Sequence, residues 1–257
     1  MRRITITGIC LVAAFALTAL AAASASAALP EIYECHKQTG GKYTEKKCTK
    51  EASGKTAGKY ELGPWGSLSG AKKGKEIKGT SKAAALHAGG TEIKCKSSTS
   101  TAYLTGPKTE GEVNVAFKGC EALGHPCNSI TPKGKSGEIK TKELQGKLGF
   151  LEGKSPEVGI DVSPASGKFL AEFECAGLIV EVEGSAIGTV TPTNTWTKTS
   201  DQTFEENGKE EQKDQQLEGE SPDHLETTIK ALSISKESSA QVEVNAAKGS
   251  EELYLKA

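Results

Sequence analysis

Residues 112–117 read Glu-Val-Asn-Val-Ala-Phe, a stretch in which every second side chain is a large apolar one. Three further stretches, 158–162, 169–173 and 179–183, show the same period of two residues. Successive side chains of a β-strand point to opposite faces, so this alternation is typical of a strand with one buried face. The four stretches therefore predict a sheet protein whose strands each turn one face toward a core.

Shorter strand-like fragments fill much of the sequence around these four. They lie at 91–95, 102–104, 138–141, 187–190, 227–232, 241–244 and 252–255. Clusters of Gly, Pro and Ser separate nearly all of them, at spacings typical of β-sandwiches and barrels. Only 217–225 is ambiguous between a helix and a loop. We therefore expect an all-β fold, with an antiparallel sandwich or barrel as the domain over 84–257.

The N-terminus has the pattern of an export signal. Arg2 and Arg3 precede an apolar run over 9–23, and Ala25-Ser26-Ala27 supplies the small residues of a signal-peptidase site. The run is about 15 residues long, shorter than the roughly 20 that a membrane-spanning helix needs. The sequence predicts a signal peptide at 1–27, cleavage after Ala27, and a secreted, extracellular chain with no membrane span.

Residues 28–62 are expected to form a small separate module. Cys35 and Cys48 bracket a Gly40-Gly41 turn, and the segment has few large apolar side chains. A segment with so little core usually needs a covalent staple. The next residues, 63–83, are rich in Gly, Ser and Lys and predict a flexible linker.

The secreted chain has an even number of cysteines, which indicates a disulfide framework in an exported protein. The expected pairs are Cys35–Cys48, Cys120–Cys127 and Cys95–Cys175. The first would staple the small module, and the second flanks a natural turn at Gly124-His125-Pro126. The third joins the two cysteines that remain.

Composition and motifs exclude several functions. The secreted chain has no arginine, the residue best suited to bidentate recognition of phosphates and base edges, so we expect no nucleic-acid partner. No serine-hydrolase elbow or phosphate loop is complete, and no zinc spacing is present. We therefore expect no catalytic residues, no metal ligands and no cofactor.

Charge is unevenly distributed along the chain. Residues 31–82 contain twice as many lysines as glutamates, whereas 201–226 are strongly acidic and predict a solvated loop with a hairpin tip at 205–209. A lysine-rich segment would be attracted to an anionic cell-wall polymer or another extracellular glycan. Trp65 and Trp196 lie beside turns, where they could stack on sugars, but we favour packing in the core.

Two stretches carry a resemblance. The first runs from Cys35-His36-Lys37 through Gly41-Lys42-Tyr43-Thr44 to Lys47-Cys48-Thr49 and Gly58-Lys59-Tyr60-Glu61. The second runs from Ile93-Lys94-Cys95 through Val115–Cys120, Pro126–Ser129, Gly137–Thr141 and Leu144–Gly149 to Phe173–Gly177. Together they cover roughly two thirds of the secreted chain, and they resemble uncharacterised secreted actinobacterial proteins. The resemblance implies export and a shared fold, and it implies no activity.

The first functional hypothesis is therefore a monomeric, non-catalytic binding module of the cell envelope or the extracellular space. A secreted hydrolase of unrecognised type is one alternative. The other is a protease-inhibitor-like protein that exposes a rigid loop between Cys120 and Cys127.

Overall fold

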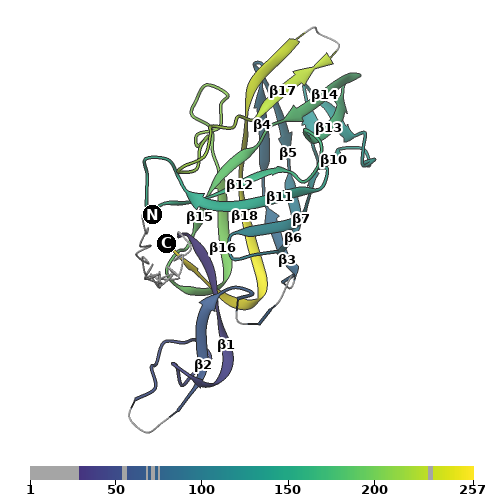
Figure 1. The fold of residues 1–257 in the computed structure, drawn as a ribbon. Helices are drawn as coiled ribbons and strands as arrows, with labels where there is room; N and C mark the ends of the chain where they lie inside the picture. Colours follow the sequence, from purple (N-terminus) through teal and green to yellow (C-terminus); the bar gives the residue numbers. More distant parts are fainter. Residues whose placement is uncertain (1–28, 54–56, 68, 71–72, 75, 231–233) are drawn as a thin grey trace, which may run out of the picture.

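The computed structural model describes residues 29–53, 57–67, 69–70, 73–74, 76–230 and 234–257 (Figure 1). The expected signal peptide, 1–27, lies outside these residues. The regular structure of the described residues consists of strands joined by turns and loops, as the alternating sequence pattern predicts, and none of these residues is in an α-helix. The described residues accordingly include no helix with the length and apolar character needed to cross a membrane.

Most strands follow one another along the chain through short connections. Their bounds are β1 (Glu31–Gly41), β2 (Gly58–Pro64), β3 (Glu76–Ser81), β4 (Ala84–Ala88), β5 (Thr91–Cys95), β6 (Ser97–Leu104), β7 (Thr109–Lys118), β8 (Glu121–Ala122), β9 (His125–Ser129), β10 (Glu138–Lys140), β11 (Leu144–Phe150), β12 (Val158–Pro164), β13 (Phe169–Cys175), β14 (Leu178–Glu183), β15 (Ala186–Thr191), β16 (Trp196–Phe204), β17 (Glu226–Ile229) and β18 (Ile234–Lys256). Longer segments join β1 to β2 and β16 to β17.

Among the described residues, eight strands close into an antiparallel barrel. The order around its wall is β3, β6, β7, β11, β12, β15, β16 and β18, and β18 returns to β3. Of the two architectures expected from the sequence, the protein therefore adopts the barrel. Closure leaves none of these strands with a free edge, which removes the usual site of edge-to-edge aggregation.

A second circuit of pairings extends the barrel at its upper end in Figure 1. It runs through β18, β4, β5, β8, β9, β13, β14 and β17 and returns to β18. The long strand β18 belongs to both circuits, so the two stack into one tube. The main core lies inside this tube and includes Leu86, Ile93, Leu144, Ile160 and Phe173.

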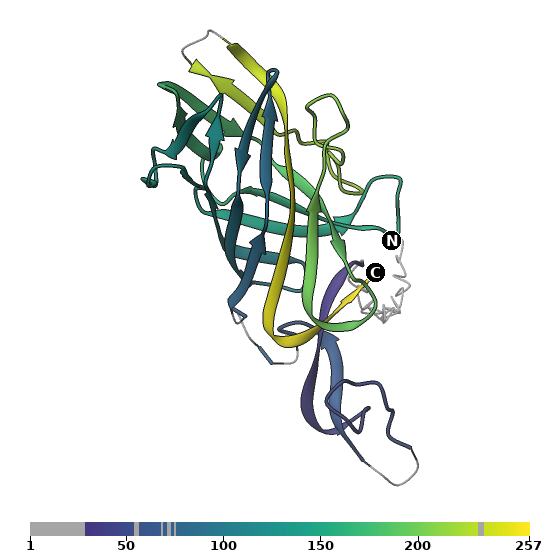
Figure 2. The same ribbon diagram turned by 180° about the vertical axis from the view of Figure 1, so that it is seen from behind.

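The N-terminal hairpin of β1 and β2 projects from the lower end of the barrel (Figures 1 and 2). The Cys35–Cys48 disulfide joins β1 to the segment that follows it, which confirms that expected pair. The base of the hairpin is part of the barrel, because residues 31–33 of β1 pair with residues 254–256 of β18. The buried side chain of Ile32 packs into the main core. The module expected at 28–62 therefore shares its first residues with the barrel.

The expected linker over 63–83 requires a correction. Residues 76–81 form β3, which pairs with β6 on one side and with β18 on the other. Trp65, also inside the expected linker, is buried, as predicted for a core residue. Glycine and lysine suggested flexibility, yet Lys78 has its side chain on the outer surface and Gly79 faces the inside of the barrel. The expected linker is therefore wrong for 76–81, because small and long polar residues can form a strand without the apolar alternation that marks one in the sequence.

Four cysteines lie in a row across β5, β8, β9 and β13, and their pairing differs from the prediction. The bonds are Cys95–Cys120 and Cys127–Cys175, so the expected pairs Cys95–Cys175 and Cys120–Cys127 are wrong. Cys120 and Cys127 are indeed neighbours across the β8–β9 hairpin. Cys120 is bonded instead to Cys95, and Cys127 is bonded to Cys175. The sheet places β5 beside β8 and β13 beside β9, which brings the members of each pair together.

Residues 205–225, here called the closing segment, run between the end of β16 and the start of β17. Along β18, pairing with β16 ends at Glu243 and pairing with β17 begins at Ser238, which leaves a gap on that side. The closing segment fills the gap: the Gln212 side chain bonds to both backbone groups of Gln241, and the backbone N–H of Ser239 donates to the carbonyl of Leu225. The predicted loop is thus anchored along one face.

Candidate binding cavity

The tube encloses a cavity, here called the upper chamber, with about 120 Å³ accessible to the centres of water-sized molecules. One water needs roughly 10–15 Å³ on this measure, so the chamber has room for more than isolated waters. An eight-stranded barrel is just wide enough to be filled by side chains or to hold one small ligand. The wall made by β7, β11, β12 and β13 is apolar except for Glu110 on β7. Its side chains include Val113, Val115, Phe117, Leu144, Val162, Leu170 and Phe173.

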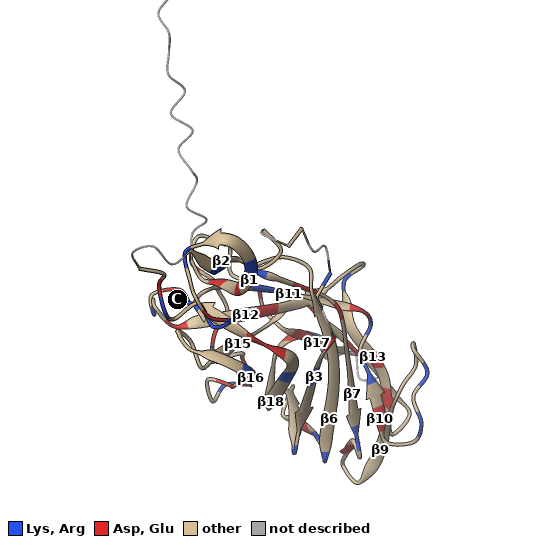
Figure 3. Ribbon diagram, turned by 90° about the horizontal axis from the view of Figure 1, so that it is seen from below, with Lys and Arg blue, Asp and Glu red and all other residues tan. Residues whose placement is uncertain are grey.

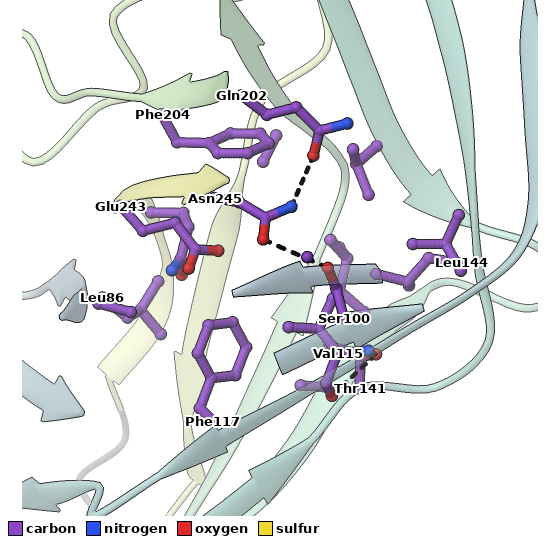
Figure 4. Close-up of a pocket in the computed structure, with 18 of the residues that line it drawn as sticks. Leu86, Ser100, Val115, Phe117, Thr141, Leu144, Gln202, Phe204, Glu243 and Asn245 are labelled. Carbon is purple, nitrogen blue, oxygen red and sulfur yellow. Dashed lines mark hydrogen bonds between the residues drawn. The ribbon is translucent and has the colours of Figure 1, made fainter. Parts of the chain in front are cut away.

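The opposite wall carries a line of hydrogen-bonded polar side chains, here called the polar row (Figure 4). Ser100 on β6 donates to the Oδ1 atom of Asn245 on β18 over 3.3 Å. Asn245 in turn donates through Nδ2 to Oε1 of Gln202 on β16 over 2.8 Å. Three strands of the barrel wall are thereby joined through side chains in the interior.

Gly79 makes this row possible. It lies on β3, between Ser100 on β6 and the β18 strand that carries Asn245. A Cβ atom at residue 79 would lie 2.1 Å from Oγ of Ser100 and 2.3 Å from Oδ1 of Asn245. Glycine is therefore required because two neighbouring side chains meet across its backbone.

On strand β18 the polar side chains of the alternating pattern face the interior, and an apolar side chain faces outward. In Gln241-Val-Glu-Val-Asn245 the apolar residues would normally face the core. Here Gln241, Glu243 and Asn245 line the upper chamber, while Val244 is 50% exposed on the outside. The register with β16, in which Gln202 lies opposite Asn245, fixes this orientation. The sequence predicts a strand over 241–244 but carries no signal for the face that the strand turns inward.

Glu110 reaches the interior because of a β-bulge in β7. Between the pairs Thr101–Asn114 and Tyr103–Gly111, β7 has one residue more than β6, and Glu112 has a positive φ of 51°. An extra residue shifts the inside–outside alternation by one position. Val113 and Glu110 consequently both face the cavity. Alternation counted along the sequence would have placed Glu110 outside, so the residue escaped prediction.

The two interior carboxyl groups are poorly solvated. Burial raises the pKa of Glu110 to about 7, and no hydrogen bond or charge from the described residues opposes this effect. Burial also raises the pKa of Glu243 to about 7, against the lowering effect of a 2.9 Å hydrogen bond from Ser98. Both side chains keep some accessible surface because they border the chamber, although surrounding protein atoms disfavour their charge.

A second space, here called the lower chamber, adjoins the first toward the N-terminal hairpin. It offers about 80 Å³ on the same measure and is lined by Ile32, Leu148, Ile160, Val190, Leu253 and Leu255, among others. Ile77, Glu110, Gln202 and Ala247 line both chambers, so the two are contiguous. Glu110 therefore lies at their junction. Lys198 and Glu251 are among the residues at the outer part of the lower chamber.

Trp196, which the sequence offered as a sugar-stacking residue, and the histidine His87 both lie away from the cavity. Trp196 is half-buried on β16 and its ring lies 5.5 Å from that of Tyr254, centroid to centroid. His87 contacts Glu206, at 2.6 Å from Nδ1, and thereby ties the closing segment to β4. Within the described residues, no cluster of three or more His, Cys, Asp or Glu side chains is arranged to hold a metal ion. The cavity is thus the candidate site that the fold itself creates.

No protein-family model, no curated protein and no solved structure matches this chain.

Proposed function

We propose that this chain is a secreted, non-catalytic protein that binds one small, mainly apolar molecule inside its barrel. The observation that carries this proposal is the upper chamber, where an apolar wall faces a row of hydrogen-bonding side chains. Pockets for small molecules typically combine many apolar contacts with a few fixed polar groups that orient the ligand.

The composition of the interior supports a binding role over a purely structural one. Val244 on the outside and Glu243 on the inside lower the stability of the fold relative to the opposite arrangement. Natural proteins tend to break such local rules at functional sites. Polar interior residues on β18 are therefore best explained by a molecule that they contact.

The disulfides support export. Three bonded pairs are typical of an oxidising compartment, which fits the signal peptide expected at 1–27. Release from the cell after cleavage remains part of the proposal. Such a protein would carry or sequester its ligand outside the cell without altering it.

Binding to an anionic cell-wall polymer receives less support. Several lysines of the segment 31–82 are paired with acidic side chains, in Lys42–Glu51, Lys47–Glu252, Lys73–Glu112 and Lys78–Glu76. Figure 3 shows basic and acidic residues interspersed over the strands. Exposed pairs of this kind leave little net field to attract a polyanion. We therefore place the ligand in the cavity.

A cavity-filling variant tests the proposal. Ala102 on β6 is buried and lines the upper chamber, so Ala102→Phe would place a ring inside it. Thr99 is exposed on the outer face of the same strand, so Thr99→Phe adds the same ring outside. The purified secreted chain is titrated with an apolar fluorescent dye, and native mass spectrometry detects molecules that co-purify with it.

We expect the wild type and Thr99→Phe to bind one dye molecule and Ala102→Phe to bind none, with all three folded by circular dichroism. Equal dye binding by Ala102→Phe and the wild type would place the ligand elsewhere. No binding of dye and no co-purified molecule in the wild type would contradict the proposed function.

One further observation favours a second candidate, the inhibitor-like protein. Leu123 is 82% exposed at the tip of the β8–β9 hairpin, whose two base cysteines are each bonded to a neighbouring strand. A rigid loop loses little entropy on binding, so a rigid loop with a protruding apolar side chain suits the substrate-binding cleft of a protease. Inhibition of secreted proteases by the wild type, lost in Leu123→Asp, would support this candidate.

A further inference from the structure

The interior carboxyl groups restrict the chemistry of the ligand, and this inference rests on the proposed function. The hydroxyl and amide groups of the polar row are bonded to one another. Within the described part of the chain, the Glu243 carboxyl accepts a side-chain hydrogen bond only from Ser98, and no hydrogen bond to the Glu110 carboxyl is found. Both carboxyl groups therefore keep lone pairs that a donor group of a ligand can reach from the chamber.

No described side chain that lines the upper chamber is Lys, Arg or His. In the lower chamber the added charged residues are Lys198 and Glu251. A ligand with a carboxylate or phosphate would thus meet two acidic groups and no counter-charge in the upper chamber. Repulsion and the cost of burying an unpaired anion both disfavour such a ligand.

We infer that the ligand is an apolar molecule that carries a protonated amine, and that Glu243 is the group that receives the amine. An ammonium group has three N–H donors and no acceptor. Glu243 can accept one of them, and Oδ1 of Asn245, two residues further along β18, lies on the same wall of the chamber. The apolar part of the ligand would then lie against Val115, Phe117 and Leu144.

The electrostatics of the upper chamber agree with this assignment. A carboxyl group with a pKa of about 7 lacks the positive partner that would stabilise its charge. An ammonium group in the chamber would supply that partner through a charge-assisted hydrogen bond, which is stronger than a neutral one. A neutral alcohol would gain the apolar contacts without this bond.

Three probes with the same chain and different head groups test the inference: octylamine, octan-1-ol and octanoate. Each is titrated into the purified secreted chain at about pH 7.5 by calorimetry or by displacement of the dye. Glu243→Gln keeps the shape of the side chain and removes its charge. Glu110→Gln removes the other interior carboxyl, and Glu174→Gln removes an exposed one on the outer face of β13.

We expect octylamine to bind at least about tenfold more tightly than octan-1-ol, and octanoate to bind more weakly than either. In Glu243→Gln this preference for the amine should disappear while binding of octan-1-ol is unchanged. Glu174→Gln should behave as the wild type.

Equal affinities of octylamine and octan-1-ol for the wild type would overturn the inference and leave the proposed function intact. Loss of the amine preference in Glu110→Gln, with none in Glu243→Gln, would overturn the assignment of Glu243. Failure of all three probes and of the dye to bind would instead overturn the proposed function.

Discussion

The backbone N–H of Cys127 donates to the carbonyl oxygen of Cys120 over 3.0 Å, yet the two side chains are bonded to different partners. The hairpin thus brings together two cysteines that do not form a disulfide with each other. Cys127–Cys175 closes a separation of 48 residues, whereas the alternative Cys120–Cys127 bridge would close only the short hairpin loop. In the chain-entropy model, a bridge that closes the longer loop stabilises the fold by about 4 kcal/mol, which is more than a bridge across the short loop would contribute.

Cleavage after glutamate distinguishes the two pairings, because it places these four cysteines on four peptides: 93–110, 113–121, 122–138 and 175–181. With thiols blocked and without reduction, we expect 93–110 linked to 113–121 and 122–138 linked to 175–181. A linked pair of 113–121 with 122–138 would contradict the pairing.

Glu110 should make stability depend on pH. Its protonated form is compatible with burial, so the stability that it contributes is fully present below its unfolded pKa of 4.5 and is lost as the pH rises through about 7. Glu110→Gln stays neutral at every pH. Between about pH 5 and about pH 8, we expect the free energy of unfolding of the wild type to fall by on the order of 2 kcal/mol relative to that of this variant.

Urea unfolding at a series of pH values measures this difference, with Glu174→Gln as the exposed control. Parallel stability curves for the wild type and Glu110→Gln would show that Glu110 ionises normally in the folded protein.

Gln212 should be important for stability although it lies in an acidic loop. Its side chain is 2% exposed and satisfies both backbone groups of Gln241. Gln212→Ala would leave these groups without their partner, at a cost of about 1–3 kcal/mol in the free energy of unfolding. Lys209→Ala, on the exposed tip of the same segment, should have little effect. Equal unfolding midpoints for the two variants would argue against an anchored closing segment.

Ile32 tests whether the N-terminal hairpin and the barrel unfold together. Its buried side chain belongs to the main core and lines the lower chamber. Ile32→Ala should lower the stability of the whole barrel by about 2–4 kcal/mol, whereas Lys37→Ala on the exposed part of β1 should not. A hairpin that unfolds independently would leave the main transition of Ile32→Ala unchanged in calorimetry.

Gly79→Ala should disrupt the polar row from the backbone side. The added Cβ would displace Ser100 or Asn245, because it would lie within 2.3 Å of an oxygen atom of each. We expect a loss of about 1–3 kcal/mol in stability. Combined with Asn245→Ala, part of this loss should vanish, because one of the two clashes is removed while the clash with Ser100 remains. Additive losses in the double-mutant cycle would contradict the role assigned to Gly79.

The sequence by itself determined that the protein is all-β, and it located most strands of the barrel. Alternation over 112–117 and 179–183 carries this information because a strand with one buried face must repeat every two residues. The staple between Cys35 and Cys48 was also predictable, because the two cysteines flank one short local turn. Each of these features depends on residues that are close together in the chain.

Tertiary structure alone decided the disulfide row and the interior of the barrel. Cys95 and Cys175 find their partners through the lateral order of β5, β8, β9 and β13, which no local pattern encodes. Glu110 faces inward because a bulge shifts the alternation, and Glu243 does so because pairing with β16 and β4 fixes the register of β18. A period of two identifies two faces, but only the closure of the barrel decides which one lies inside.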